Sequence, residues 1–103
     1  MTQAVFNTLE IGDKVYFTKT YRKWLSEHAF EMNEVRGEIL DDHKKDFLSW
    51  VNIGINNYSH VNVIDIRDGS MIRAEAVMLD DTTYTGWVEM ENIYKRGVTN
   101  ENG

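Results

Sequence analysis

The chain contains no cysteine, no proline and no long apolar run. Without cysteine there is no disulfide, no thiolate nucleophile and no cysteine-ligated zinc site, and we expect the reducing cytoplasm as its location. No segment contains about 18 consecutive apolar residues, the length that a membrane-spanning helix requires, so no membrane span is predicted. The first residues, MTQAVFNTLEIGDK, lack the basic stretch and apolar run of a signal peptide.

Charge and length set the next limits. The 103 residues carry 17 acidic and 11 basic side chains, a formal net charge of −6. Such a chain repels polyphosphate at long range and suits basic partners, including proteins that themselves hold nucleic acid, although the charge also serves solubility. The length predicts one domain with one modest core. We expect this core to span residues 11–94, with ends that fray at 1–8 and 98–103.

Alternating apolar residues and tight turns predict a mainly β chain. In the first strand, Val15 and Phe17 alternate with Lys14, Tyr16 and Thr18, as in a half-buried strand. Further strands are predicted at residues 35–40, 49–55, 60–66, 71–79 and 86–90. The turns between them are marked by Asn56-Asn57 within NNYS, by Asp68-Gly69, and by DDTTYTG at 80–86. Five or six short strands of this kind favour a small closed barrel, which has no exposed edges.

Three segments depart from the β pattern. Residues 21–33 place apolar side chains at helical spacing and predict a helix, although FEMNEVRGEIL also fits a long strand. Residues 41–48 form a loop or a short helix, and residues 90–96 a single helical turn. In the stretch 71–79, Val77 and Leu79 make the far end apolar on both faces, which indicates cover on both sides.

The first strand opens with Gly12-Asp13-Lys14-Val15, a long excursion follows it, and Trp87-Val88 near the end is followed by a helical turn. This order of elements resembles an SH3-like barrel, the group that includes KOW and Tudor domains. The resemblance implies a helical insertion within a barrel, and a module that holds nucleic acid, methylated side chains, peptides or whole proteins. Two departures from the KOW pattern are the helical excursion at 18–34 and DDHKKDF in place of a glycine-containing turn.

An acidic stretch gives the first candidate binding face. Residues 27–42 contain six acids and one base, Arg36. Carboxylates one helical turn apart lie about 5–6 Å from each other, similar to phosphates along a strand, and could occupy the basic cleft of a nucleic-acid-handling protein. Phe30 falls away from the apolar face of the predicted helix, as an interface hot spot would. The predicted partner-binding residues are Glu27, Phe30, Glu31, Glu34, Asp41 and Asp42. The alternative is an ordinary solvent-facing helix flank.

A basic cluster gives the alternative face. Lys14, Lys19, Arg22 and Lys23 are interleaved with aromatic residues, as on surfaces that bind single-stranded nucleic acid. The simpler explanation is a solvated strand end and first helical turn, with Trp24 in the core. A Tudor-like arrangement would make Tyr58, Tyr84 and Trp87 an aromatic cage for a methylated cation. The simpler explanation is that Trp87 packs inside the barrel and the two tyrosines cover its rim.

Catalytic and metal-binding patterns are weak. His28, His43 and His60 lack metal-ligand spacing, and Ser26 would not face His28 on a helix. No phosphate-cradling glycine loop is present. We therefore expect neither an enzyme nor a bound metal or cofactor.

These observations lead to two hypotheses. The first is a non-catalytic protein-binding module that binds or inhibits a basic nucleic-acid-handling protein through its acidic face. Short, acidic, cysteine-free chains of this style resemble accessory proteins of phages and mobile elements. The second is a KOW-like nucleic-acid-binding domain that uses the basic cluster at 14–23. The sequence leaves the oligomeric state open.

Overall fold

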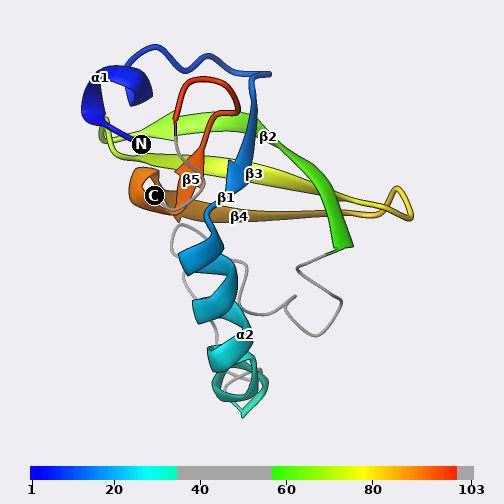
Figure 1. Ribbon diagram of the computed structural model, residues 1–103. Helices are drawn as coiled ribbons and strands as arrows, with labels where there is room; N and C mark the ends of the chain where they lie inside the picture. Colours follow the sequence, from blue (N-terminus) through cyan, green and yellow to red (C-terminus); the bar gives the residue numbers. More distant parts are fainter. Residues whose placement is uncertain (35–56, 100–103) are drawn as a thin grey trace.

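The computed structural model describes residues 1–34 and 57–99, with side chains for 1–27 and 57–99. This part of the chain is mainly β (Figure 1). Its elements in chain order are α1 (Gln3–Phe6), β1 (Lys14–Phe17), α2 (Lys19–Glu34), β2 (Tyr58–Arg67), β3 (Met71–Met78), β4 (Thr83–Glu89), the 3-10 turn η3 (Met90–Asn92) and β5 (Ile93–Tyr94). No helix in these ranges is both long enough and apolar enough to cross a membrane.

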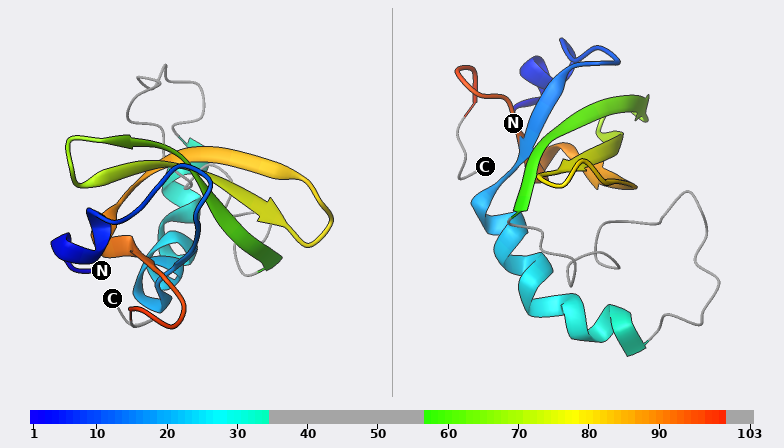
Figure 2. Two further views of the ribbon diagram at one scale, coloured as in Figure 1. Left: turned by 90° about the horizontal axis from the view of Figure 1, so that it is seen from above. Right: turned by 90° about the vertical axis from the view of Figure 1, so that its right-hand side faces the viewer.

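The five strands form one antiparallel sheet in the order β4-β3-β2-β1-β5. Strand β1 is shared between two neighbours: Lys14 and Val15 pair with β2, and Tyr16 and Phe17 pair with β5. Figure 2 shows how strongly the sheet curves. The closed barrel predicted from the sequence is wrong, because the described strands form an open sheet. Strand β5 has only two residues and pairs with β1, so β4 and β5 stay at opposite ends of the strand order.

The hairpin between β2 and β3 confirms the turn expected at Asp68-Gly69. Both residues have positive φ, 55° and 64°, as in a type I′ turn, and Arg67 faces Met71 across the hairpin. The alternation predicted for β3 is also confirmed, with Ile72 and Ala74 buried and Arg73 exposed. Leu79, however, is 70% exposed, so the expected cover on both sides does not reach it. It lies one residue past β3, where the chain turns toward β4.

Several other boundaries differ from the sequence prediction. Tyr58 and Ser59, expected in a turn, are the first residues of β2. Strand β4 begins at Thr83 rather than Gly86, because the ladder with β3 continues to the Val77–Thr83 pair. The helical turn expected at 90–96 is confirmed for Met90–Asn92, and the strand β5 that follows was not predicted. The strands predicted at 35–40 and 49–55, and the segment 41–48, lie outside the described residues.

The core combines apolar side chains of the sheet with Phe6 of α1 and with Tyr21 and Leu25 of α2. Its fully buried side chains are Phe6, Val15, Phe17, Leu25, Val61, Val63, Ile72, Ala74 and Ile93. The segment 1–8, which the sequence predicts to fray, contains α1 and contributes Phe6 to the core. The Met1 ammonium group donates to the carbonyl oxygens of Met90 and Ile93, at 3.2 and 3.3 Å.

Helix α2 follows β1 directly and projects away from the sheet (Figures 1 and 2). The buried hydroxyl of Thr18 accepts the Tyr21 N–H at 3.1 Å and so caps the helix. Tyr21 and Leu25 are buried, whereas Trp24 is 41% exposed and stacks on Tyr21 at 6.2 Å between ring centroids. A core position for Trp24 is therefore wrong: among the described side chains of α2, the buried ones are Tyr21 and Leu25. Since the sheet is open, α2 is not an insertion within a closed barrel.

Candidate binding surface

The predicted acidic face is described at only one of its side chains. Glu27 is exposed and lies 3.9 Å from Lys23, one turn earlier on α2. Phe30, Glu31 and Glu34 belong to α2 at positions without described side chains. Asp41 and Asp42 lie outside the described residues. The acidic face as a partner-binding surface therefore stays a prediction.

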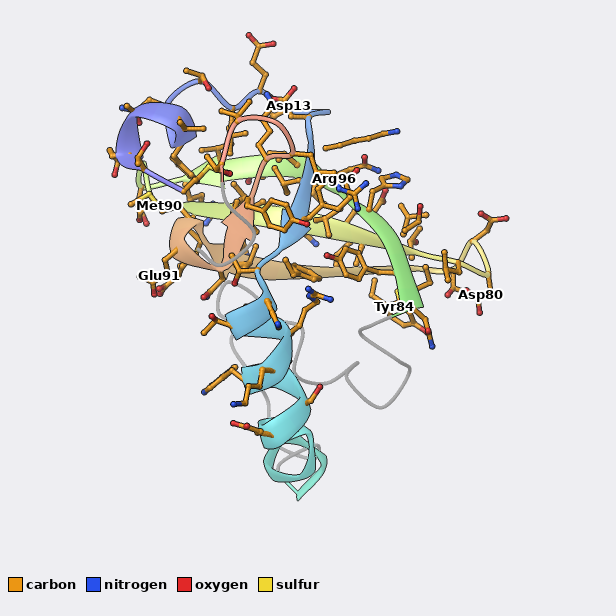
Figure 3. The ribbon with its side chains drawn as sticks, viewed as in Figure 1. Asp13, Asp80, Tyr84, Met90, Glu91 and Arg96 are labelled. Carbon is orange, nitrogen blue, oxygen red and sulfur yellow. The ribbon has the colours of Figure 1, made fainter. Side chains whose placement is uncertain are left out.

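The acidic residues of the second half of the chain do not gather at one place. Figure 3 shows Asp80 and Glu91 at opposite ends of the hairpin strands. Hydrogen bonds from the side chain and backbone N–H of Thr82 lower the pKa of Asp80. At the other end, a hydrogen bond with Glu91 raises the pKa of the Glu89 carboxyl, and burial and the Glu91 charge add to the rise.

The predicted basic cluster is divided between two elements. Lys14 is exposed at the start of β1, and Lys19 and Lys23 are exposed on α2. Arg22 is half-buried and close enough to Tyr58 for its charge to act on the tyrosine hydroxyl.

Two tyrosines on neighbouring strands form the centre of a different surface. Tyr16 of β1 is directly opposite Tyr94 of β5, and their ring centroids are 5.6 Å apart. Side chains that face each other across an antiparallel pair share one side of the sheet. We call the surface made by these two residues together with Tyr58, Arg22 and Arg96 the tyrosine–arginine surface.

Arg96 lies on top of this surface. Its guanidinium carbon is 3.8 Å from the centroid of the Tyr16 ring, a short cation–π distance. A hydrogen bond with the Tyr94 side chain raises the pKa of Arg96, and the Tyr16, Tyr94 and Tyr58 side chains add smaller favourable interactions. The group therefore stays charged and is held between tyrosines, although its side chain is exposed. Figure 3 shows Arg96 beside β1, well away from Asp80 and Glu91.

Hydrogen bonds between its first and last residues close the loop 95–99, which carries Arg96. The N–H groups of Val98 and Thr99 donate to the Lys95 carbonyl at 3.0 and 2.8 Å, and the Lys95 N–H donates to the Thr99 hydroxyl at 2.6 Å. The ammonium group of Lys95 lies 3.5 Å from the Asp13 carboxylate. These contacts fix the backbone on both sides of Arg96.

Tyr58 closes the surface on the side of β2. Its hydroxyl accepts the Phe17 N–H at 3.0 Å, and its ring centroid is 5.1 Å from that of Phe17. Burial raises the pKa of the Tyr58 hydroxyl, while the hydrogen bond with Phe17 and the charges of Arg22 and Arg96 act in the opposite direction. The two arginines thus both lie within electrostatic range of one half-buried hydroxyl.

The aromatic cage suggested by a Tudor-like reading is not assembled. The ladder places Trp87 opposite Arg73, whereas Tyr58 is opposite Met78, further along β3. Trp87 is only 6% exposed, and the Arg67 guanidinium lies 4.9 Å from its ring centroid. Trp87 is therefore a packed side chain covered by a cation of the protein itself.

Sequence reasoning missed Tyr94 and Arg96 because it assigned residues 90–96 to a helical turn. The available signal was the pair Ile93-Tyr94 directly after that turn, an apolar and an aromatic residue that suit a short strand. Pairing of this strand with β1 brings Tyr94 to Tyr16 from 78 positions away in the sequence. Comparisons with protein-family models, with curated proteins and with solved structures find no match.

Proposed function

We propose that this chain is a non-catalytic protein-binding module whose contact region includes the tyrosine–arginine surface. The observation that carries the proposal is the exposed Arg96 stacked on Tyr16 beside Tyr94. Tyrosine and arginine are enriched among the residues that dominate binding energy in protein interfaces. Here Arg96 is exposed and Tyr16 is half-buried, so both can reach a partner, whereas Tyr94 is only 8% exposed and supports them.

The overall charge supports a protein partner over nucleic acid. At a formal charge of −6, the chain as a whole repels a polyphosphate strand, whereas a protein partner can present both signs of charge. We extend the proposal to a second contact region, the acidic face that begins with Glu27, for a basic part of the partner. In this form the chain is an accessory protein, of the style found in phages, that binds or inhibits a nucleic-acid-handling protein.

We also infer a relationship to the SH3-like group, without a closed barrel. The support is the antiparallel order of hairpin-linked strands and the 3-10 turn η3 immediately before the last strand. The relationship is compatible with a binding module but does not select its ligand.

A KOW-like nucleic-acid-binding domain is the second candidate. The observation in its favour is a set of cations near the tyrosines of the surface: Lys14 precedes Tyr16 on β1, the charge of Arg22 acts on Tyr58, and Arg96 stacks on Tyr16. This candidate predicts binding of single-stranded oligonucleotides that weakens steeply as salt concentration rises. Absence of oligonucleotide binding at low salt would exclude it.

The test of the proposed function is quantitative capture of partners from lysate by the tagged full-length chain. The variant Arg96→Ala should lose the partners that the unaltered chain captures. The matched control is Arg73→Ala, which removes another exposed arginine, on β3, outside the tyrosine–arginine surface. Equal capture by Arg96→Ala and the unaltered chain would reject this surface as the contact region.

A further inference from the structure

We propose that Arg96 is a receptor for a carboxylate side chain of an acidic segment in the partner protein. The inference rests on the proposed function and specifies the chemistry of what binds. It starts from the guanidinium of Arg96, which is exposed and stacked 3.8 Å above the Tyr16 ring. It adds a ligand class that the acidic face on α2 would not recognise.

The stacking leaves the binding edge of the guanidinium available. A guanidinium is planar and carries five N–H donors in its plane, arranged to meet both oxygens of a carboxylate. The guanidinium carbon lies 3.8 Å from the Tyr16 ring centroid, so the ring covers one side of the group. The N–H donors lie in the plane of the group, at an exposed position, where a carboxylate can approach edge-on.

Arg96 is also ordered in advance. A free arginine side chain loses rotamer entropy when binding immobilises it. Here the contact with the Tyr16 ring and the hydrogen-bonded loop 95–99 restrain it already. A carboxylate that binds Arg96 therefore has less entropy to overcome than one that binds an unrestrained lysine.

No carboxylate in the described residues forms an ion pair with Arg96. In residues 1–27 and 57–99, ion pairs join Lys23 to Glu27, Arg67 to Asp65 and Lys95 to Asp13. Asp13 also accepts the Glu10 N–H at 2.9 Å, so its carboxylate has two partners. The contacts of Arg96 are aromatic, which leaves its charge without an internal counterion in this part of the chain.

The surroundings favour a short acidic peptide over a nucleic-acid strand. A nucleic-acid strand carries a phosphate at every nucleotide and requires a track of cations along its length. The tyrosine–arginine surface offers two arginines set among tyrosine rings, too few for such a track. One or two carboxylates flanked by apolar or aromatic residues match this arrangement better.

The test is a titration of the isotope-labelled full-length chain, followed by NMR at the arginine Nε–H signals. The probes are an N-acetylated hexapeptide of alternating Glu and Gly, its Gln–Gly counterpart and hexathymidylate. We expect the Glu–Gly peptide to shift the Arg96 signal saturably in the millimolar range, and the Gln–Gly peptide to leave it unchanged. Arg96→Lys lacks the arginine signal, so its binding is followed at the backbone N–H signals of residues 95–99. This variant should bind the Glu–Gly peptide about tenfold more weakly, because lysine lacks the bidentate edge. Arg73→Lys should leave its binding unchanged.

Three results would overturn the inference: no shift of Arg96 with the Glu–Gly peptide, equal affinity after Arg96→Lys, or tighter saturation by hexathymidylate. The last result would assign the surface to nucleic acid.

The capture experiment separates this inference from the proposed function. If capture depends on Arg96 while the Glu–Gly peptide does not bind, the carboxylate inference alone fails. If capture is independent of Arg96, the proposed function fails as well.

Discussion

At the scale of single residues, Tyr58 links the candidate surface to the core. Its ring packs on Phe17, and its hydroxyl accepts the Phe17 N–H at 3.0 Å. Tyr58→Phe keeps the ring and removes that acceptor, so the free energy of unfolding should fall by about 1 kcal/mol. Urea denaturation measures the change. Tyr16→Phe is the control and should stay within about 0.5 kcal/mol of the unaltered protein. Equal stability of Tyr58→Phe and the unaltered protein would contradict the role of the hydroxyl.

The carboxyl pair Glu89 and Glu91 predicts a pH dependence. The pKa of Glu89 is raised above 4.5 by Glu91, so its stabilising contribution is complete below that value and is lost as pH rises through the raised pKa. At neutral pH the two carboxylates repel each other. Glu91→Gln should therefore raise the free energy of unfolding at neutral pH by about 0.2–0.5 kcal/mol. Melting temperatures compared from acid to neutral pH should show this gain shrinking in acid, and a gain independent of pH would refute the explanation.

At the scale of elements, the β2–β3 hairpin depends on its turn. Gly69 has a φ of 64°, and a Cβ added there would meet nothing within 4 Å, so substitution costs only backbone conformation. Gly69→Ala should lower the free energy of unfolding by about 1–2 kcal/mol. Gly69→Asn should cost less, because asparagine tolerates the left-handed region. Thermal denaturation of both variants tests the turn, and equal losses for Ala and Asn would argue against backbone strain as the cause.

Local patterns predicted some elements well and others poorly. The alternation in β1 and β3 and the Asp68-Gly69 turn were predictable, since each depends on neighbours in the sequence. Strand β5 has only a weak local signal, the apolar and aromatic pair Ile93-Tyr94, because two residues carry no periodicity and form a strand by pairing with β1. Trp24 was misplaced for a related reason: helical spacing identifies an apolar side of α2, but not how much of that side the sheet covers. The Tyr16–Tyr94 pair is formed by the pairing of β5 with β1, so it could not be predicted without that strand.

At the scale of the whole molecule, closure of the sheet was the main error. Turn signals and strand counts do not determine whether the first and last strands meet, because closure depends on strand length and register across the entire sheet. The strand order nevertheless creates the candidate surface. By placing β1 between β2 and β5, it brings Tyr58, Tyr16 and Tyr94 toward one region and sets Arg96 above them.

The most direct test of this account is site-specific photo-crosslinking in cells. A benzophenone amino acid replaces Lys14, which is exposed on β1 two residues before Tyr16 and on the same side of the strand. The control chain carries the same group in place of Leu79, which is 70% exposed beyond the end of β3. The account predicts a discrete crosslinked protein from position 14 that disappears with Arg96→Ala, and none from position 79. Crosslinks from position 79 alone, or crosslinks from position 14 that survive Arg96→Ala, would contradict it.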